Sequence, residues 1–274
     1  MKRREFLKSS IAVTSMAGLA TTAVSATAAA QGGRREYYEL RAYHLKPGGD
    51  RNLLENYLEK AAIPGLNRLG IKPVGVFVQQ PREGAAGNTE LRDDSVIWVL
   101  LPYPSVETFA TAAQKLSADR EHQKAGAEYL ETAKATPGFE RIDSWLMLAF
   151  AGMPRIELPA YAKEKKSRMF ELRCYESYSE VKAQKKVDMF NSGEIDVMRE
   201  TGLAPVFYGQ ALIGRNLPHL TYMLSAENQD AHKQHWDAFG KHPTWNKMKN
   251  DPQYADTVSR ITNWFVVPRS YSQV

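Results

Sequence analysis

The chain has 274 residues, of which 43% are hydrophobic and 24% are charged, proportions that exclude a disordered or collagen-like protein. Lys and Arg number 36 against 31 Asp and Glu, and without residues 1–30 the balance is 32 against 30. An excess this small argues against a dedicated nucleic-acid-binding protein, which needs a clustered basic face. The single cysteine, Cys174, excludes an intrachain disulfide and a Cys-x-x-Cys metal site.

Residues 1–30 predict a cleaved export signal. A charged start that contains Arg3 and Arg4 precedes a weakly apolar run, and small residues follow it. The paired arginines resemble the twin-arginine signal of bacteria, which implies a periplasmic or extracellular protein. We expect cleavage after Ala30, with Ala26 as the alternative. Polar residues interrupt the apolar run, and no other segment approaches ~18 consecutive apolar residues, so no integral membrane segment is expected after cleavage.

An internal repeat organises the rest of the chain. Residues 38–43, Tyr-Glu-Leu-Arg-Ala-Tyr, recur at residues 170–175 as Phe-Glu-Leu-Arg-Cys-Tyr. Near the end of each copy an Arg-Ile-x-x-Trp motif follows, at residues 141–145 and 260–264. Self-similarity of this kind predicts repeated structural units. We expect two homologous domains, residues 34–150 and 168–271, joined by a linker at residues 151–167.

Both copies predict the same order of elements. A first strand (residues 37–45 and 168–175) leads into an amphipathic helix that ends at Gly70 or Gly202. Two strands follow (residues 74–79 and 96–101 in the first copy, 206–212 and 220–224 in the second), then helical segments (105–134 and 228–258) and a strand with the Arg-Ile-x-x-Trp motif. This βαββαβ order predicts an α+β protein with two tandem ferredoxin-like domains, each with its helices on one face of an antiparallel sheet.

A family resemblance rests on the opening strand and one later helix. The strand motif, together with Trp236-x-x-Phe239-x-x-His242-Pro243-x-Trp245, resembles the NIPSNAP family of the dimeric α/β-barrel superfamily. The second copy matches better, because the first lacks these aromatic residues. The resemblance implies two ferredoxin-like sheets packed face to face as an α/β barrel within one chain. It allows a homo-oligomer and assigns no reaction, since most of the family has none and fold does not fix function.

Strand alternation divides each first strand into two faces. We expect the apolar face to pack beneath the helices and the polar face to lie where the two sheets meet. The polar residues are Glu39, Arg41, Tyr43, Glu171, Arg173 and Tyr175. Because a buried charge must be paired, they either form structural Glu–Arg pairs or line a ligand cavity in which arginine binds a carboxylate or phosphate.

His44 and Tyr43 are weak catalytic candidates. His44 ends the first strand and corresponds to Glu176 in the second copy, so these two residues are expected to face each other. No cofactor is predicted; haem at one of these two residues is the alternative, because the superfamily includes haem proteins. No metal site is predicted either, because His232 and His235 have no carboxylate at a ligand spacing. Cys174 lies on the apolar face and should behave as a buried hydrophobic residue.

Two functions fit the sequence. The first is an exported protein that binds a small ligand or acts as a scaffold through its barrel. The alternative is an enzyme without a demanding cofactor, a monooxygenase, isomerase or lyase, that acts on an apolar or aromatic carbonyl compound. The sequence has no nucleophile elbow and no phosphate-binding glycine loop. An enzyme should have an apolar cavity with a titratable group of shifted pKa, whereas a scaffold should fill that space with side chains.

Overall fold

Alternating β-forming residues build eight antiparallel strands that close into one barrel. The structure is a computed structural model, and it describes residues 34–80 and 95–274; the predicted export signal lies outside the described residues. The strands run around the barrel in the order β1-β3-β2-β8-β5-β7-β6-β4. They are β1 (Tyr37–His44), β2 (Gly75–Gln79), β3 (Val96–Tyr103), β4 (Arg141–Ala149), β5 (Met169–Glu176), β6 (Ala204–Ile213), β7 (His219–Ala226) and β8 (Arg260–Pro268). The predicted α/β barrel is confirmed.

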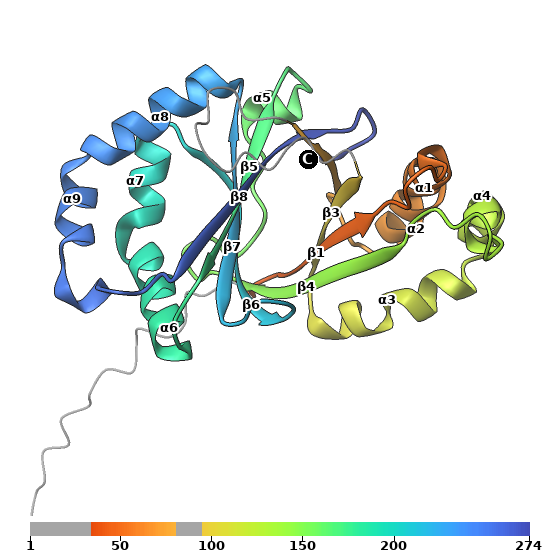
Figure 1. Cartoon of the computed structure of the whole chain (residues 1–274), viewed down its shortest axis with the longest axis horizontal. Coiled ribbons are helices and arrows are strands. Elements are labelled where there is room, and N and C mark those ends of the chain that lie inside the picture. The colour runs from red at the N-terminus through yellow and green to blue at the C-terminus, as the bar shows by residue number, and fades with distance from the viewer. Residues whose placement is uncertain (1–33, 81–94) are drawn as a thin grey trace, which may run out of the picture. The chain divides into compact units, whose positions relative to one another are not determined.

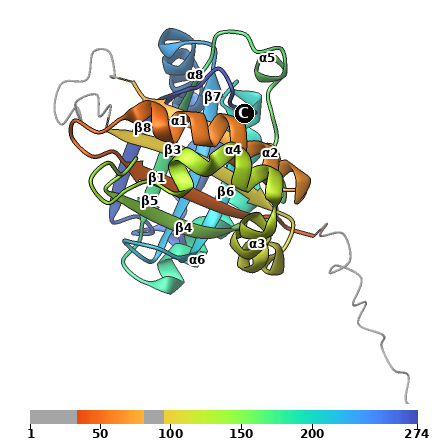
Figure 2. The ribbon, with the colours of Figure 1, turned by 90° about the vertical axis from the view of Figure 1, so that its right-hand side faces the viewer.

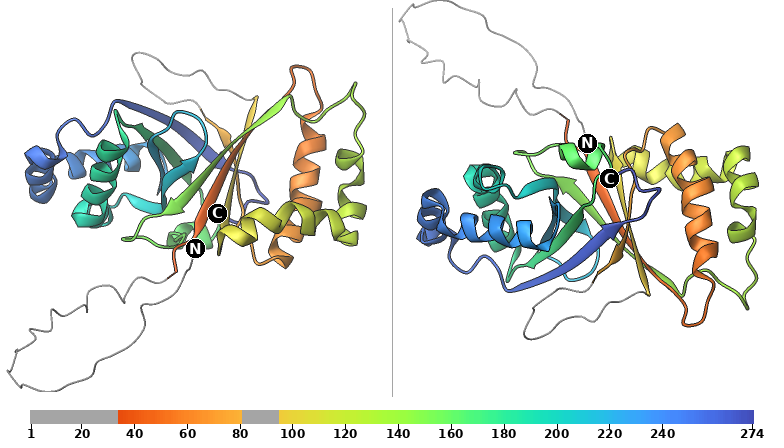
Figure 3. Two further views of the ribbon diagram at one scale, coloured as in Figure 1. Left: turned by 90° about the horizontal axis from the view of Figure 1, so that it is seen from below. Right: turned by 90° about the horizontal axis from the view of Figure 1, so that it is seen from above.

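Helices cover the barrel on two opposite sides (Figures 1 and 3). On one side lie α1 (Arg51–Tyr57), η1 (Leu58–Ala62), α2 (Ile63–Arg68), α3 (Val106–Ala118) and α4 (Arg120–Leu130), which Figure 2 shows in front of the strands. On the other side lie α6 (Glu180–Met189), η2 (Phe190–Glu194), α7 (Ile195–Glu200), α8 (Gln229–Lys241), α9 (Pro243–Lys249) and η3 (Pro252–Tyr254). The short α5 (Ala160–Lys163) belongs to the connection between β4 and β5. Among the described helices, none is long and apolar enough to cross a membrane.

The two halves of the described chain repeat each other in detail. Both contain a one-turn π-helix, η1 and η2, and these lie 132 positions apart, which is the spacing of the sequence repeat. The helices α2 and α7 end just before Gly70 (φ +78°) and Gly202 (φ +85°), in the left-handed conformation that favours glycine. The described residues nevertheless form a single compact unit. The division into domains at residues 34–150 and 168–271 therefore stays a prediction.

The halves are joined through the edges of their sheets. Strand β2 pairs with β8 (Val78 opposite Val267), and β4 pairs with β6 (Leu148 opposite Gln210). Two sheets that faced each other without edge pairing would leave the backbone groups of both edges unpaired. Pairing across the halves satisfies those groups and abolishes the edges. The two sheets therefore face each other across the interior core, as expected, and their paired edges make them one continuous barrel wall.

The two faces of the first strands are the reverse of those expected. Tyr38 and Leu40 of β1 and Phe170 and Leu172 of β5 point into the barrel, where they form one apolar core. The Glu-x-Arg-x-Tyr residues point outward beneath the helices; Tyr43, for example, packs in the core under α1 and α2. The reason is that a barrel interior is enclosed by strands alone and has few partners for charge, whereas polar groups of neighbouring strands and helices are available outside.

One end of the barrel is closed by chain segments that follow the strands. Ile156 and Leu158, from the connection after β4, pack against the interior core, and so does the C-terminal residue Val274. Ser272 accepts a hydrogen bond from the backbone of Val76 (3.0 Å) and holds this tail against β2. The opposite end, where β1 and β5 finish and β4 and β8 begin, contains the cavity described below.

Candidate functional site

Glu39 of β1 is a buried carboxylate whose hydrogen-bonding capacity is filled. It is 4% exposed. Arg41 donates to both of its oxygens, from Nε to Oε1 (2.7 Å) and from Nη2 to Oε2 (2.8 Å). Tyr103 and Ser144 add further donors, each at 2.8 Å. Burial alone would raise the pKa of Glu39, but Arg41 and the hydroxyl donors outweigh it and lower the pKa. The group is a structural ion pair.

Glu171 of β5 occupies the matching place in the second half. Its Oε1 accepts from Arg173 Nη1 (2.5 Å) and from Asn263 (2.8 Å), and its Oε2 lies 2.7 Å from His232 Nε2 and accepts from Trp236 Nε1 (2.9 Å). The guanidinium of Arg173 lies 4.7 Å from the centre of the Trp236 ring. Against the effect of burial, Arg173 and His232 lower the pKa of Glu171 to about 2. Trp236 of the helix motif thus donates a hydrogen bond to a buried carboxylate whose charge Arg173 balances.

We expect the stability of the protein to fall in acid through Glu171. The folded-state pKa of about 2 lies below the ordinary value of 4.5, so the stabilisation is complete above pH 4.5 and is lost as the pH falls toward 2. Linkage makes the loss about 3 kcal/mol. Urea unfolding between pH 5 and 2 measures this loss. The free energy of unfolding should fall less steeply with decreasing pH in Glu171→Gln than in the wild type. An equal slope in both proteins would contradict the assignment to Glu171.

The six residues predicted to bind a ligand are thus separated from the barrel cavity. Tyr43 accepts a long hydrogen bond from Arg41 (3.4 Å), and Tyr175 contacts Tyr222 (2.8 Å) beneath the second set of helices. None of the six lines the cavity at the open end of the barrel. Ligand binding by these residues stays a prediction, and their contacts favour the structural interpretation.

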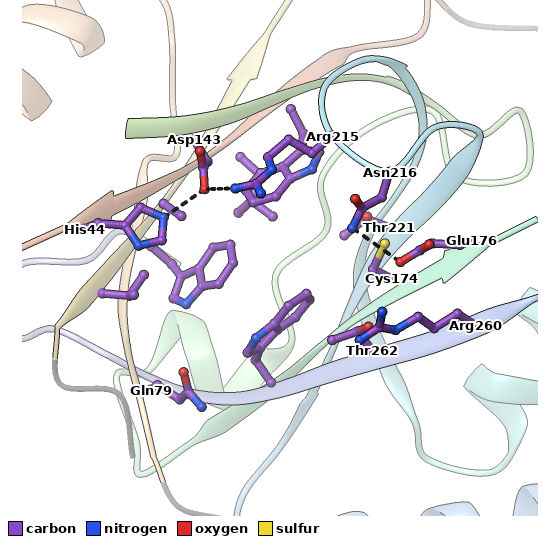
Figure 4. Close-up of a pocket in the computed structure, with 16 residues that line it drawn as sticks. His44, Gln79, Asp143, Cys174, Glu176, Arg215, Asn216, Thr221, Arg260 and Thr262 are labelled. Carbon is purple, nitrogen blue, oxygen red and sulfur yellow. Dashed lines mark hydrogen bonds and ion pairs between the residues drawn. The ribbon is translucent and has the colours of Figure 1, made fainter. Parts of the chain in front are cut away.

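A cavity of about 360 Å³ opens at the end of the barrel where β1 and β5 finish (Figure 4). Three tryptophans line it: Trp98 of β3, Trp145 of β4 and Trp264 of β8. Trp98 stacks on Trp145 (centroids 5.7 Å apart) and lies 5.2 Å from Trp264. Trp98 is 5% exposed, and its Nε1 has no hydrogen-bond partner among the described residues. Trp145 and Trp264 come from the repeated Arg-Ile-x-x-Trp motif, whose tryptophans were expected from the sequence to be core residues and, as the alternative, part of an aromatic ligand cage.

His44 and Asp143 form a polar pair in this cavity. His44 Nε2 lies 2.9 Å from Asp143 Oδ2, and Arg215 Nη1 donates to the same oxygen (2.9 Å), as Figure 4 shows. Partial burial would raise the pKa of Asp143, but the hydrogen bonds from His44 and Arg215 hold it below its usual range. In the tautomer with its proton on Nε2, His44 donates to Asp143 and has a lone pair on Nδ1. Arg141 Nη2 lies 3.4 Å from Nδ1.

The cavity is asymmetric although the halves repeat. In the register of the strands, Trp98 lies opposite Ala42 of β1, and Thr221 lies opposite Cys174 of β5. Thr221 therefore stands in the second half where Trp98 stands in the first. On the other neighbouring strand, Asp143 of β4 lies opposite Ala42, and Thr262 of β8 lies opposite Cys174. Thr262 is about as large as Asp143, but Thr221 is much smaller than Trp98 and leaves space that a second tryptophan would fill.

The structure places His44 and Glu176 in the same cavity, as expected from their equivalent positions. Tyr43, the other catalytic candidate, points away from it. Cys174 lines the cavity, and burial raises the pKa of its thiol to about 11, so it remains a buried neutral group, as predicted. Asp143, Trp98 and Arg215 were not predicted as site residues from the sequence. For Asp143 a signal existed, since it lies inside the Arg-Ile-x-x-Trp motif.

Haem at His44, the alternative from the sequence, would have to bind through Nδ1, because Nε2 lies 2.9 Å from Asp143. Arg141 Nη2 lies 3.4 Å from Nδ1 and occupies that side of the ring in this structure. The part of the chain that the structure describes contains no group of three or more His, Cys, Asp or Glu side chains that could hold a metal ion. We derive no step through haem.

Comparison with known proteins matches the second half to a family. Residues 170–273 match the NIPSNAP family model. This NIPSNAP segment runs from β5 through β8 and includes the aromatic helix motif, which the first half lacks. The resemblance deduced from the sequence is thus supported for the second half. A search of curated proteins finds no match.

The solved structures that resemble the chain share its fold. A proposed monooxygenase from Lactobacillus acidophilus superposes with a TM-score of 0.54 at 8% identity, over 85% of this chain and 94% of that chain. A proposed monooxygenase from Fusobacterium nucleatum superposes with a TM-score of 0.50 at 10% identity, over 85% of this chain and 92% of that chain. A NIPSNAP-like domain protein from Burkholderia xenovorans gives 0.35 at 19% identity, over 38% of this chain and 88% of that chain. At these identities the first two show the fold alone, that of the dimeric α/β-barrel proteins.

Proposed function

We propose that this chain binds a small ligand in the tryptophan-lined cavity at the open end of the barrel. The observation that carries the proposal is the space itself, which the second half leaves open by having Thr221 where the first half has Trp98. A volume of about 360 Å³ lies at the lower end of the range for ligand pockets, which are mostly apolar with a few polar groups. A scaffold protein would have filled this space.

The same proposal covers the organisation of the chain. We infer that the whole described chain consists of two tandem ferredoxin-like copies of the NIPSNAP type, the first of which has diverged further. The matched spacing of the π-helices η1 and η2 supports this inference. Fusion of two copies lets one cavity carry different residues on its two sides, which a symmetric homodimer cannot do. Export through residues 1–30 also remains our proposal.

Ligand binding is tested with the purified protein. Native mass spectrometry and absorbance spectroscopy should reveal a retained small molecule, or titration with neutral naphthalene carboxamide should quench the tryptophan fluorescence saturably. Trp264→Leu should weaken this binding, whereas Trp245→Leu, which removes a tryptophan that packs on Phe239 outside the barrel, should leave it unchanged. A protein without a retained molecule that also fails to bind the probe would contradict the proposal.

A second candidate function is proton transfer to or from a carbonyl compound, and the His44–Asp143 pair favours it. With Nε2–H directed to Asp143 at 2.9 Å, Nδ1 of His44 could accept a proton from a ligand if Arg141, at 3.4 Å, moves aside. The guanidinium of Arg215 keeps Asp143 ionised, so that Asp143 stabilises the imidazolium that results. This arrangement matches the alternative enzyme function predicted from the sequence.

Proton transfer is tested by hydrogen exchange of tetralone, an aromatic ketone, in deuterated water. An enzyme of this class should accelerate exchange of the protons next to the carbonyl group, as nuclear magnetic resonance measures it. His44→Gln should abolish the acceleration, and Asp143→Asn should reduce it by about a hundredfold or more. Exchange no faster than in buffer would reject this second function for ketones and leave ligand binding intact.

A further inference from the structure

We propose that the ligand is a planar aromatic anion of the carboxylate class, bound between Trp98 and the threonines of the second half. This inference rests on the proposed function, since it names the class of ligand that the same cavity takes. Its argument comes from an unpaired donor, from the charges at the cavity mouth and from the difference between the two halves.

The aromatic part follows from the cavity wall. Trp98, Trp145 and Trp264 present ring faces and edges from three strands, and aromatic pairs gain energy beyond the area they bury. Opposite them stand Thr221 and Thr262, which are too small to complete the stack. A flat ring inserted there would take the position that a second copy of Trp98 would occupy.

The unpaired donor is Trp98 Nε1. A buried N–H without a partner costs free energy comparable to a lost hydrogen bond, so such groups are rare unless a ligand or water completes them. Trp98 is 5% exposed and lines the cavity, and its Nε1 lacks a partner among the described residues. The atom is buried from solvent in this conformation, so a ligand oxygen in the cavity would accept from it after a small rotation of the indole ring. The ligand should therefore carry a hydrogen-bond acceptor.

The negative charge follows from the guanidinium and carboxylate groups at the mouth. The charge of Asp143 is balanced by Arg215, and His44 Nε2 lies within hydrogen-bonding distance of the same oxygen. Among the described residues, the carboxylate of Glu176 accepts a single long hydrogen bond, from Asn216 (3.4 Å). Arg260 lines the cavity without a hydrogen bond or ion pair among the described residues. Among the described residues, Arg215 offsets Asp143 and Arg260 stands opposite Glu176. Arg141 lies outside the cavity lining, with its Nε 4.0 Å from Asp143 Oδ2, and adds one positive charge that a negative charge on the ligand would balance.

Arg260 is the residue that would bind this charge. A guanidinium offers two parallel N–H donors that match a carboxylate. The side chain of Arg260 is exposed, so binding an anion removes it from water only in part. Glu176 lies opposite Arg260 across the β5–β8 ladder and would be the nearest carboxylate to the ligand. Repulsion from Glu176 limits how much the negative charge of the ligand increases its affinity.

The test compares two probes that differ in charge alone, naphthalene carboxylate and naphthalene carboxamide, by titration of tryptophan fluorescence. We expect the carboxylate to bind about tenfold more tightly to the wild-type protein. Arg260→Met should remove this preference, and Arg260→Lys should restore part of it. Lys249→Met, which removes an exposed positive charge on α9, is the matched control and should keep the preference.

The outcomes separate this inference from the proposed function. Equal affinities for the two probes, or a preference that survives in Arg260→Met, would overturn the anion assignment while ligand binding stands. Failure of both probes to bind, together with the absence of a retained molecule, would overturn both. Preferential binding of the carboxylate that depends on Arg260 supports both.

Discussion

Replacement of Lys186 by leucine is expected to lower the free energy of unfolding by about 3–5 kcal/mol, because it leaves the carboxylate of Glu194 buried without a counter-charge. Lys186 Nζ lies 2.8 Å from Glu194 Oε2, and the two residues are 4% and 2% exposed. The ammonium also lies 4.7 Å from the centre of the Phe190 ring. Glu194→Ala should be similarly costly, since it leaves the ammonium buried alone. Urea unfolding at neutral pH measures both.

The first half of the chain supplies the control. At the positions equivalent to Lys186 and Glu194 it has Leu54 and Ala62, which are buried in an apolar core beneath α1 and α2. The double variant Lys186→Leu/Glu194→Ala therefore reproduces a solution that the fold already uses. Its stability should recover to within about 1 kcal/mol of the wild type, because apolar replacement of a whole buried pair is often neutral. A double variant as unstable as the sum of the single variants would show that the pair does not act as a unit.

Arg173→Met is expected to cost about 3–5 kcal/mol, because Glu171 would lose its cation in a site that is 1% exposed. The packing of the guanidinium over Trp236 would be lost as well. Differential scanning calorimetry should show a Tm lower by roughly 10 °C. A thermal shift near zero would refute the structural role of Arg173.

Arg199→Met is the matched control for this substitution. Arg199 pairs with Glu157 at 2.9 Å, but both side chains are substantially exposed to solvent, so this pair should contribute less than about 1 kcal/mol. A loss as large as that of Arg173→Met would mean that the substitution of arginine by methionine is costly wherever it is made, and the comparison would no longer support burial as the cause.

Most of the element order could be predicted from the sequence because the signals are local. The first strand alternates apolar and polar residues, the helices before the second strands end at glycines with positive φ, and the repeat checks each element against its copy. The local pattern does not show which face of a strand points into the barrel. Alternation separates Leu40 from Glu39 and Arg41, yet which side faces the barrel depends on how the sheet closes, and the expectation was wrong.

The candidate site was predictable only in part, for the same reason. His44 and Glu176 were paired by their positions in the repeat, and both line the cavity. Asp143 and Arg215 come close only because β4 and β6 pair across the two halves, which no pattern within one half can show. Thr221 has no chemical signature of its own; its importance appears only when the strand register sets it against Trp98.

The most direct test of the binding cavity is the variant Thr221→Trp, which places the residue of the first half into the second. We expect its free energy of unfolding to stay within about 1 kcal/mol of the wild type, because the new indole enters space that is already open. Binding of naphthalene carboxylate, measured by isothermal titration calorimetry, should be lost. A stable variant that binds the probe as well as the wild type would contradict the account, and so would a destabilisation above about 3 kcal/mol, which would show that side chains already fill this space.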